Sequence, residues 1–206
     1  MVGRRNRRGC PIYDEKISSM TINAINAESE LLEAVRDEII RGTGINEGQC
    51  DVEYDELPPA MAGDVHVMVI PGGMRKGDPE TGGGAVVSRY IDVDVAVVFK
   101  LGRRPRDRRR SLYKDNQDSV NAWLDQIEDV VDFEYINIIN KTNEALGVPA
   151  GEGFIHPLVS HGPGKPRAVG PEYFDHETNQ RQGSDGTYGL VRIVHFRDAH
   201  FILTRT

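Results

Sequence analysis

The segment from Tyr90 to Leu101 constrains the fold more than any other part of the chain. Apolar side chains recur there at every second position, and Asp92 and Asp94 stand between them. Because successive side chains of a β-strand point to opposite faces, this alternation predicts a strand with one face in the core. The residues predicted to form that core face are Ile91, Val93, Val95, Val97 and Phe99.

A second strand is predicted before this one, from Asp64 to Ile70. Val65, Val67 and Val69 alternate there with His66 and Met68, and the sequence Pro-Gly-Gly then ends the pattern. The two strands flank a stretch that contains Gly82, Gly83 and Gly84, and we expect them to pair antiparallel if this stretch folds back as an extended hairpin. The stretch is longer than a compact hairpin needs, which suggests a role outside the monomer.

Two amphipathic helices are predicted, one from Asn26 to Arg41 and a longer one from Asp118 or Ser119 to about Leu146. In each, apolar residues recur at three- and four-residue steps, and glycine or proline follows the last turn. The first stripe comprises Ala27, Leu31, Leu32, Val35, Ile39 and Ile40, and the second comprises Val120, Trp123, Leu124, Ile127, Val130 and Val131.

The remaining sequence is poor in periodic patterns. Residues 1–25 are predicted to form an irregular N-terminal arm, because glycine and proline interrupt its first part and no apolar period is sustained there. Residues 151–186 are rich in glycine, proline and polar residues and are predicted to be loop, with one short strand near Phe154 to Val159. Tyr188 to Phe196 then has the pattern of a strand, followed by an extended piece from His200 to Thr204.

These elements predict an α+β fold, in which a small antiparallel sheet packs against two helices, with long loops and an N-terminal arm. A length of 206 residues fits one domain, since single domains mostly hold about 100 to 200 residues. The predicted organisation is an arm at 1–25 and a single domain at 26–206, with a loop-rich excursion at 151–186.

Positive charge is concentrated in two arginine clusters, although the net charge is -7. The acidic remainder argues against general affinity for nucleic acid, which draws on a basic face. No apolar run approaches the roughly 20 residues that span a bilayer, so we expect a chain that is neither membrane-spanning nor obviously secreted. Cys10 and Cys50 form no CxxC pair and are expected to be free thiols. The clusters are Arg4, Arg5, Arg7 and Arg8, and Arg103, Arg104, Arg106, Arg108, Arg109 and Arg110.

The sequence predicts no catalytic site, no metal site and no cofactor. Asp92 and Asp94 share a strand face and could hold a divalent metal beside Lys100, as in a nuclease, but Asp-x-Asp on a strand is a weak motif. No nucleophile motif accompanies His195 and His200, and no glycine motif for phosphate binding is present. The remaining histidines do not have the spacing of a zinc site; they are His156, His161 and His176.

Five segments together resemble the tail terminator, or tail completion, proteins of long-tailed bacteriophages. They are LLEAVRDEII, VHVMVIPGG, RYIDVDVAVVFK, SVNAWLDQIEDVV and YGLVRIVHF. In element order the resemblance covers residues 26 to 203. It implies a small α+β subunit that assembles into a hexameric ring, caps the finished tail tube and presents a surface for joining to the head. The family has no catalytic residues to carry over, so the resemblance implies a protein that is not an enzyme.

The resemblance further implies a structural virion protein, assembled in the host cytoplasm and located in the tail or neck. Its partners would be itself, the tail tube protein and a neck or head-completion protein. The chain departs from short family members in its arginine-bearing arm and in the excursion at 151–186. Neck and head-completion connectors use similar small folds and extended arms and are the alternative, and a metal-dependent nuclease is a further one.

The arginine clusters are the predicted assembly contacts, because their charge contrasts with the acidic remainder. Their target would be an acidic surface of an adjacent subunit or ring, or alternatively DNA that passes through the lumen. Replacing Arg108, Arg109 and Arg110 by Ser is expected to weaken ring formation and tail joining, both followed with the purified protein. If both stay intact, the protein-contact hypothesis fails. Tight subunit affinity without DNA retention at physiological salt would argue against the DNA hypothesis.

Overall fold

The computed structural model describes residues 12–53, 64–77, 86–102, 106–165, 167–169 and 188–204. Within these ranges, side chains are described for residues 26–53, 64–77, 86–99, 118–165 and 189–204. The helices are α1 (Ile12–Thr43), the short 3-10 helix η1 (Glu47–Gln49), α2 (Arg106–Phe133) and α3 (Tyr135–Leu146). The strands are β1 (Cys50–Val52), β2 (Val65–Lys76), β3 (Val86–Gly102), β4 (Gly153–His156), β5 (Val159–Pro163), β6 (Arg167–Val169) and β7 (Tyr188–Thr204).

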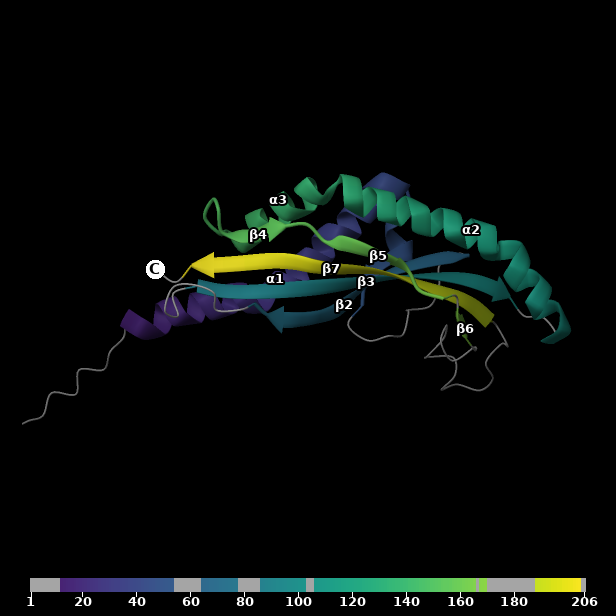
Figure 1. Ribbon diagram of the computed structural model, residues 1–206, viewed down its shortest axis with the longest axis horizontal. Helices are drawn as coiled ribbons and strands as arrows, with labels where there is room; N and C mark the ends of the chain where they lie inside the picture. Colours follow the sequence, from purple (N-terminus) through teal and green to yellow (C-terminus); the bar gives the residue numbers. More distant parts are fainter. Residues whose placement is uncertain are drawn as a thin grey trace, which may run out of the picture.

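The fold is α+β, with one sheet whose inner face is covered by the three α-helices of the described chain (Figure 1). The strand order is β1-β2-β3-β7-β4, and β5 and β6 also pair with β7. All pairs are antiparallel except the one between β1 and β2, which is parallel. The sheet is therefore mixed, and the prediction of a purely antiparallel sheet was wrong at this one edge.

The centre of the sheet confirms the predicted strand pairing and core face. β2 pairs antiparallel with β3, with Val67 opposite Val97 and Val69 opposite Val95. These four side chains are fully buried and pack against the apolar stripes of α1 and α2. Of the predicted core face of β3, only Phe99 is partly exposed, and it still packs on the core.

Both long helices differ from their predicted bounds. α1 begins at Ile12, inside the stretch predicted to be an irregular arm, and α2 begins at Arg106, inside the predicted arginine-rich loop. Neither 12–25 nor 106–117 contains glycine or proline, and arginine is a good helix former, so the helices continue beyond the apolar stripes that predicted them. A search for periodic apolar residues cannot detect such turns.

The single long helix predicted to end near Leu146 is two helices, α2 and α3. The break lies at Glu134, whose backbone (φ -100°, ψ 14°) departs from helical values, and Glu134 makes no side-chain cap. α3 ends as predicted at Gly147, which adopts the left-handed conformation (φ 61°) and donates to the carbonyls of Asn143 and Glu144. One helix was therefore predicted where two lie, because the apolar stripe continues across the break.

The strands also differ from the prediction in their ends. β2 runs through the Pro-Gly-Gly sequence to Lys76, with a register shift between Pro71 and Gly73. A proline such as Pro71 is tolerated in an edge strand or at a bulge, because its missing N–H is not needed there to bond a neighbouring strand. The last two predicted pieces are one strand, β7, and the single strand expected near Phe154 is two, β4 and β5.

None of the helices in the described part of the chain is both long and apolar enough to cross a membrane. Cys50 is a free, buried thiol in the core, where desolvation raises its pKa to about 12, and Cys10 lies outside the described residues.

A buried carboxylate fixes α1 against α3. Glu38 of α1 is 1% exposed. Its oxygens lie 2.8 Å from Lys141 Nζ of α3 and 2.5 Å from Nη2 of Arg41. Burial alone would raise the pKa of Glu38, but hydrogen bonds and charge attraction from Lys141 and Arg41 outweigh it and lower the pKa below 4.5.

Replacing Glu38 by Gln is expected to lower the free energy of unfolding at neutral pH by about 1 to 3 kcal/mol, because charge-assisted hydrogen bonds are lost. A carboxyl with a lowered pKa adds stability above its unfolded pKa of 4.5 and loses it as the pH falls through the folded value. The difference between the two proteins should therefore shrink below pH 4.5. Urea unfolding at several pH values measures it.

The control is Glu33→Gln, which removes an exposed carboxylate 3.4 Å from Arg36 on the same helix. Exposed pairs contribute about 0 to 1 kcal/mol, so this variant should unfold close to the wild type. Equal losses in both variants would contradict a special role of Glu38.

Candidate functional site

The outer face of the sheet, which is turned away from the helices, carries a network of charged side chains. Asp92 and Asp94 of β3 lie on it, as the alternation predicted. β2 contributes Arg75, and β7 contributes His195, Arg197 and Asp198. We call these six residues the polar network.

Both predicted aspartates are held by arginines. Arg197 Nη1 donates to Asp94 Oδ1 at 2.6 Å, and the same oxygen lies 2.9 Å from His195 Nδ1. Arg75 Nη2 lies 3.4 Å from Asp92 Oδ1 and 2.5 Å from Asp198 Oδ1. The carboxylates of Asp92 and Asp94 are mostly buried, with 13% and 24% of the side chain exposed.

A backbone feature of β7 supports this network. Asp198 adopts the left-handed conformation (φ 68°), which a residue other than glycine rarely takes. Its N–H donates to Asp92 Oδ1 at 3.1 Å, and the register between β3 and β7 shifts at this point, with Ile91 opposite Ala199 and Val93 opposite Phe196. The bulge therefore presents the Asp198 carboxylate to Arg75.

This arrangement does not favour the metal site considered for Asp92 and Asp94. A divalent cation would have to displace guanidinium groups that already neutralise both carboxylates. Among the residues that the structure describes, no group of three or more His, Cys, Asp or Glu side chains is placed to hold a metal. The side chain of Lys100, the third member of the hypothesis, lies outside those described.

A row of rings continues the polar network along the outer face. The rings of Tyr90 and His200 stack at 4.4 Å, and those of His200 and His156 at 5.7 Å. The guanidinium carbon of Arg75 lies over the Tyr90 ring, 5.6 Å from the ring centroid. Ser88 Oγ lies 2.7 Å from His200 Nε2. Burial, and then the neighbouring His156, lower the pKa of His200, so its neutral form is favoured.

The other predicted candidates do not join these groups. His161 is exposed on β5, and His176 lies outside the described residues. The first arginine cluster, together with Arg103 and Arg104, also lies outside them. In the second cluster the backbone of the remaining four arginines forms the first turns of α2, and their side chains are not described; they are Arg106, Arg108, Arg109 and Arg110.

The sequence analysis did not predict that Arg75 and Arg197 pair with Asp92 and Asp94. Arg197 follows His195 by two positions, so a continued strand at Tyr188–Thr204 would have placed both on the face of Asp94. Arg75 lies beyond the glycines that were expected to end β2, so no pattern pointed to it.

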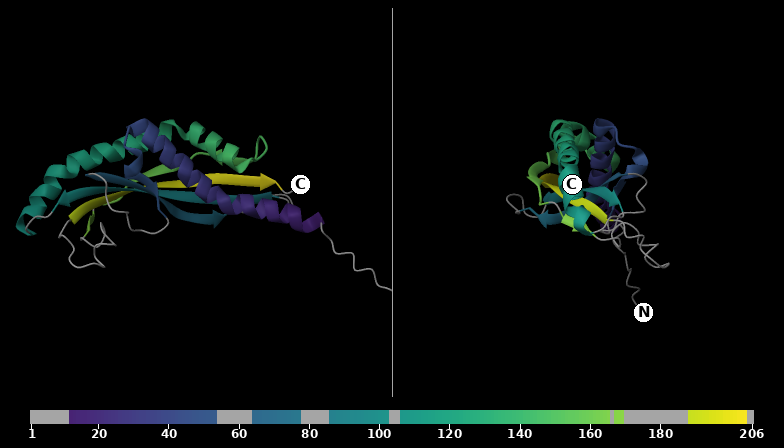
Figure 2. Two further views of the ribbon diagram at one scale, coloured as in Figure 1. Left: turned by 180° about the vertical axis from the view of Figure 1, so that it is seen from behind. Right: turned by 90° about the vertical axis from the view of Figure 1, so that its right-hand side faces the viewer.

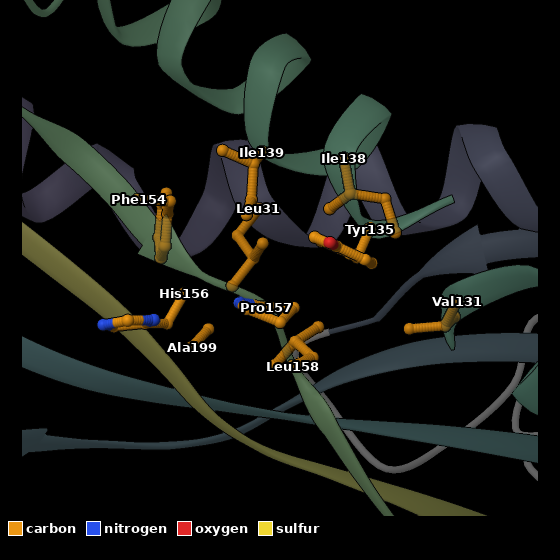
Figure 3. A pocket seen from close by; sticks show the side chains of 10 residues that line it. All are labelled: Leu31, Val131, Tyr135, Ile138, Ile139, Phe154, His156, Pro157, Leu158 and Ala199. Atoms are coloured by element: carbon orange, nitrogen blue, oxygen red, sulfur yellow. The ribbon is translucent and has the colours of Figure 1, made fainter. Parts of the chain in front are cut away.

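The described structure contains a small, apolar depression (Figure 3). It lies between the helices and β4, and the side chains that line it include Leu31, Ile138, Phe154 and Leu158. Its volume of about 10 Å³ equals the room of about one water molecule. It is too small for a substrate.

No protein-family model matches the chain, and no curated protein matches it. The family named above therefore stays a resemblance.

Gly72 is expected to be essential for the geometry of the polar network. A Cβ atom at this position would lie 2.7 Å from Arg197 Nη1 and 2.9 Å from the carbonyl carbon of Asp92. Gly72→Ala should therefore displace Arg197 from Asp94 and lower the free energy of unfolding by about 1 to 3 kcal/mol, measured by urea unfolding.

Gly48→Ala is the matched control, since its Cβ would meet no atom closer than 3.6 Å. It should change the unfolding free energy by less than about 0.5 kcal/mol. If Gly72→Ala leaves the free energy of unfolding unchanged, Arg197 can move without loss of stability, and the geometry of the polar network does not depend on Gly72.

Proposed function

We propose that the protein is a structural virion protein of the tail terminator type. In this proposal it forms a ring, hexameric as the resemblance implies, which caps the phage tail tube and joins the tail to the head–neck complex. Its partners are further copies of itself, the tail tube protein and a neck or head-completion protein, and DNA is a possible non-specific contact in the lumen.

The observation that carries this proposal is the arrangement of the secondary structure. The elements on which the resemblance depends occur in the expected order, and β2, β3 and β7 lie side by side in one sheet under the helices (Figure 1). A fold by itself does not establish a function, so the surface has to support the same conclusion.

The surface supports a role in assembly. Phe133, at the end of α2, is 80% exposed, and Ile136 on the first turn of α3 is 55% exposed. Single exposed apolar residues are common, but two large ones on either side of the junction between α2 and α3 offer an apolar area that a partner protein can bury. Such an exposed apolar area is expected in a protein that works inside an assembly, because the partner covers it there.

The polar network also supports a structural role. Its carboxylates are paired with arginines of the same chain, which favours a structural role over the metal-dependent nuclease alternative. The neck or head-completion connector would use the same fold and surfaces, so the two structural functions differ in the partner that binds.

The test is the mass of the purified protein by light scattering, with negative-stain images of the same fraction before and after addition of the tail tube protein encoded by the same genome. We expect rings, and tubes with this protein at one end. Tubes alone are the control. A monomer that ignores the tubes contradicts the proposal, and binding to a neck protein in place of the tube would assign it to the connectors.

A further inference from the structure

Two histidines meet where the short strand β4 pairs with the end of β7, and we call His156 and His200 the histidine pair. They lie opposite each other in the strand register, and their rings stack with the planes 7° apart and the centroids 5.7 Å apart. β4 lies at the margin of the sheet, beside the arrowhead end of β7 (Figure 1). The helices gather on one face of the sheet (Figure 2, right panel), and the row of rings that contains the pair lies on the other face.

The contacts that hold β4 are unequal along the strand. Its pairing with β7 is shifted in register between Phe154 and His156. Before the shift, the Phe154 ring packs on Phe201 at 5.0 Å, and Asn143 of α3 bonds the Phe154 N–H at 2.7 Å and its carbonyl at 3.0 Å. After the shift, the pairing continues through His156 and His200. The histidine pair therefore lies where the second half of β4 joins the sheet.

The groups that face the histidine pair are neutral or positive. From β3, Ser88 Oγ lies 2.7 Å from His200 Nε2, and the Tyr90 ring stacks on His200 with a phenol that carries no charge at acidic pH. From β2, the Arg75 guanidinium lies over the Tyr90 ring. From the helix side, α3 meets β4 with the uncharged amide of Asn143. Within the described part of the chain, neither histidine forms an ion pair with a carboxylate.

A proton on the histidine pair is therefore disfavoured while the rings are stacked. Asp198, two residues before His200, binds Arg75 at 2.5 Å. Burial, and then His156, lower the pKa of His200 below its ordinary value of 6.5. Once the contact opens, the imidazole returns toward that ordinary pKa, so the open form binds the proton more tightly. The stability that His200 adds is thus fully present above pH 6.5 and is lost as the pH falls from 6.5 through the folded value.

We propose that the histidine pair is an acid-sensitive clasp between β4 and β7. While both rings are neutral, their stack keeps the end of β4 on the sheet. Once both are protonated, their like charges repel, and the segment 155–158 leaves β7 while Asn143 keeps Phe154 in place. Leu158, which is 5% exposed in the closed form, then becomes accessible. This movement occurs within one subunit and does not depend on the proposed tail function.

The first test is hydrogen exchange of the full chain at about pH 7.5 and about pH 5, with each rate divided by that of an unstructured chain at the same pH. Protection of the segment 155–158 should fall at least about fivefold in acid, since each pKa unit of lowering changes the opening equilibrium up to about tenfold. Protection of Val95 and Val97 in β3 should change less than about twofold. Equal losses in both segments would indicate general acid unfolding and overturn the clasp.

Two variants separate the charge of the histidine pair from its stacking. His156→Phe keeps a flat ring against His200 but takes up no proton. An imidazolium between two aromatic rings is attracted to them, so the loss of protection in acid should shrink below about twofold, and the pKa of His200, followed by NMR, should rise. His156→Lys places a permanent charge beside His200 and should lower the protection of 155–158 at least about fivefold already at about pH 7.5.

His161→Phe is the matched control, because His161 is exposed on the neighbouring strand β5 and lies outside the row of rings. It should keep the acid response of the wild type. If His156→Phe loses protection in acid as the wild type does, another group titrates and the clasp is wrong. Unchanged protection of 155–158 in the wild type at both pH values would also overturn it. Thermal unfolding shows which variants are folded, and if His156→Phe is not, the wild type and His156→Lys decide.

Discussion

The antiparallel pairing of β3 with β7 is the interaction on which the other parts of the structure depend. It runs from Val86 opposite Thr204 to Gly102 opposite Tyr188, and all other strands except β1 pair directly with one of these two. The helices pack on the buried side chains of the same pair, so the core exists only where this ladder is formed. The polar network lies on the other face of the ladder and joins the same strands.

How much of this could be predicted depends on whether a residue faces the core. The alternation of Ile91, Val93 and Val95 predicted their strand and its buried face, because burial imposes a period of two. The starts of α1 and α2 could not be predicted in this way, since no sustained apolar period runs through the sequence of those turns. The break at Glu134 was missed for the opposite reason, because the apolar stripe continues across it.

The site was predictable only in part. That Asp92 and Asp94 share a face follows from the strand itself, but their arginine partners come from two other strands, Arg75 from β2 and Arg197 from the distant β7. To predict the pairing with β7, one needs the register of β3 with β7, and in particular the bulge at Asp198. No local sequence pattern predicts this bulge. This distinction matters for function, because two free carboxylates suggest metal chemistry and two paired ones suggest a structural face.

The edge of the sheet beyond β7 is built differently from its centre. Three short strands, β4, β5 and β6, divide that edge between them, and each pairs with β7 over only a few residues. A short strand can detach at a small free-energy cost while the neighbouring pieces stay in place, whereas β3 can leave β7 only if the core opens. None of the β5 side chains is buried, so β5 can open, in evolution or on contact with a partner, without loss of the core that holds the subunit together.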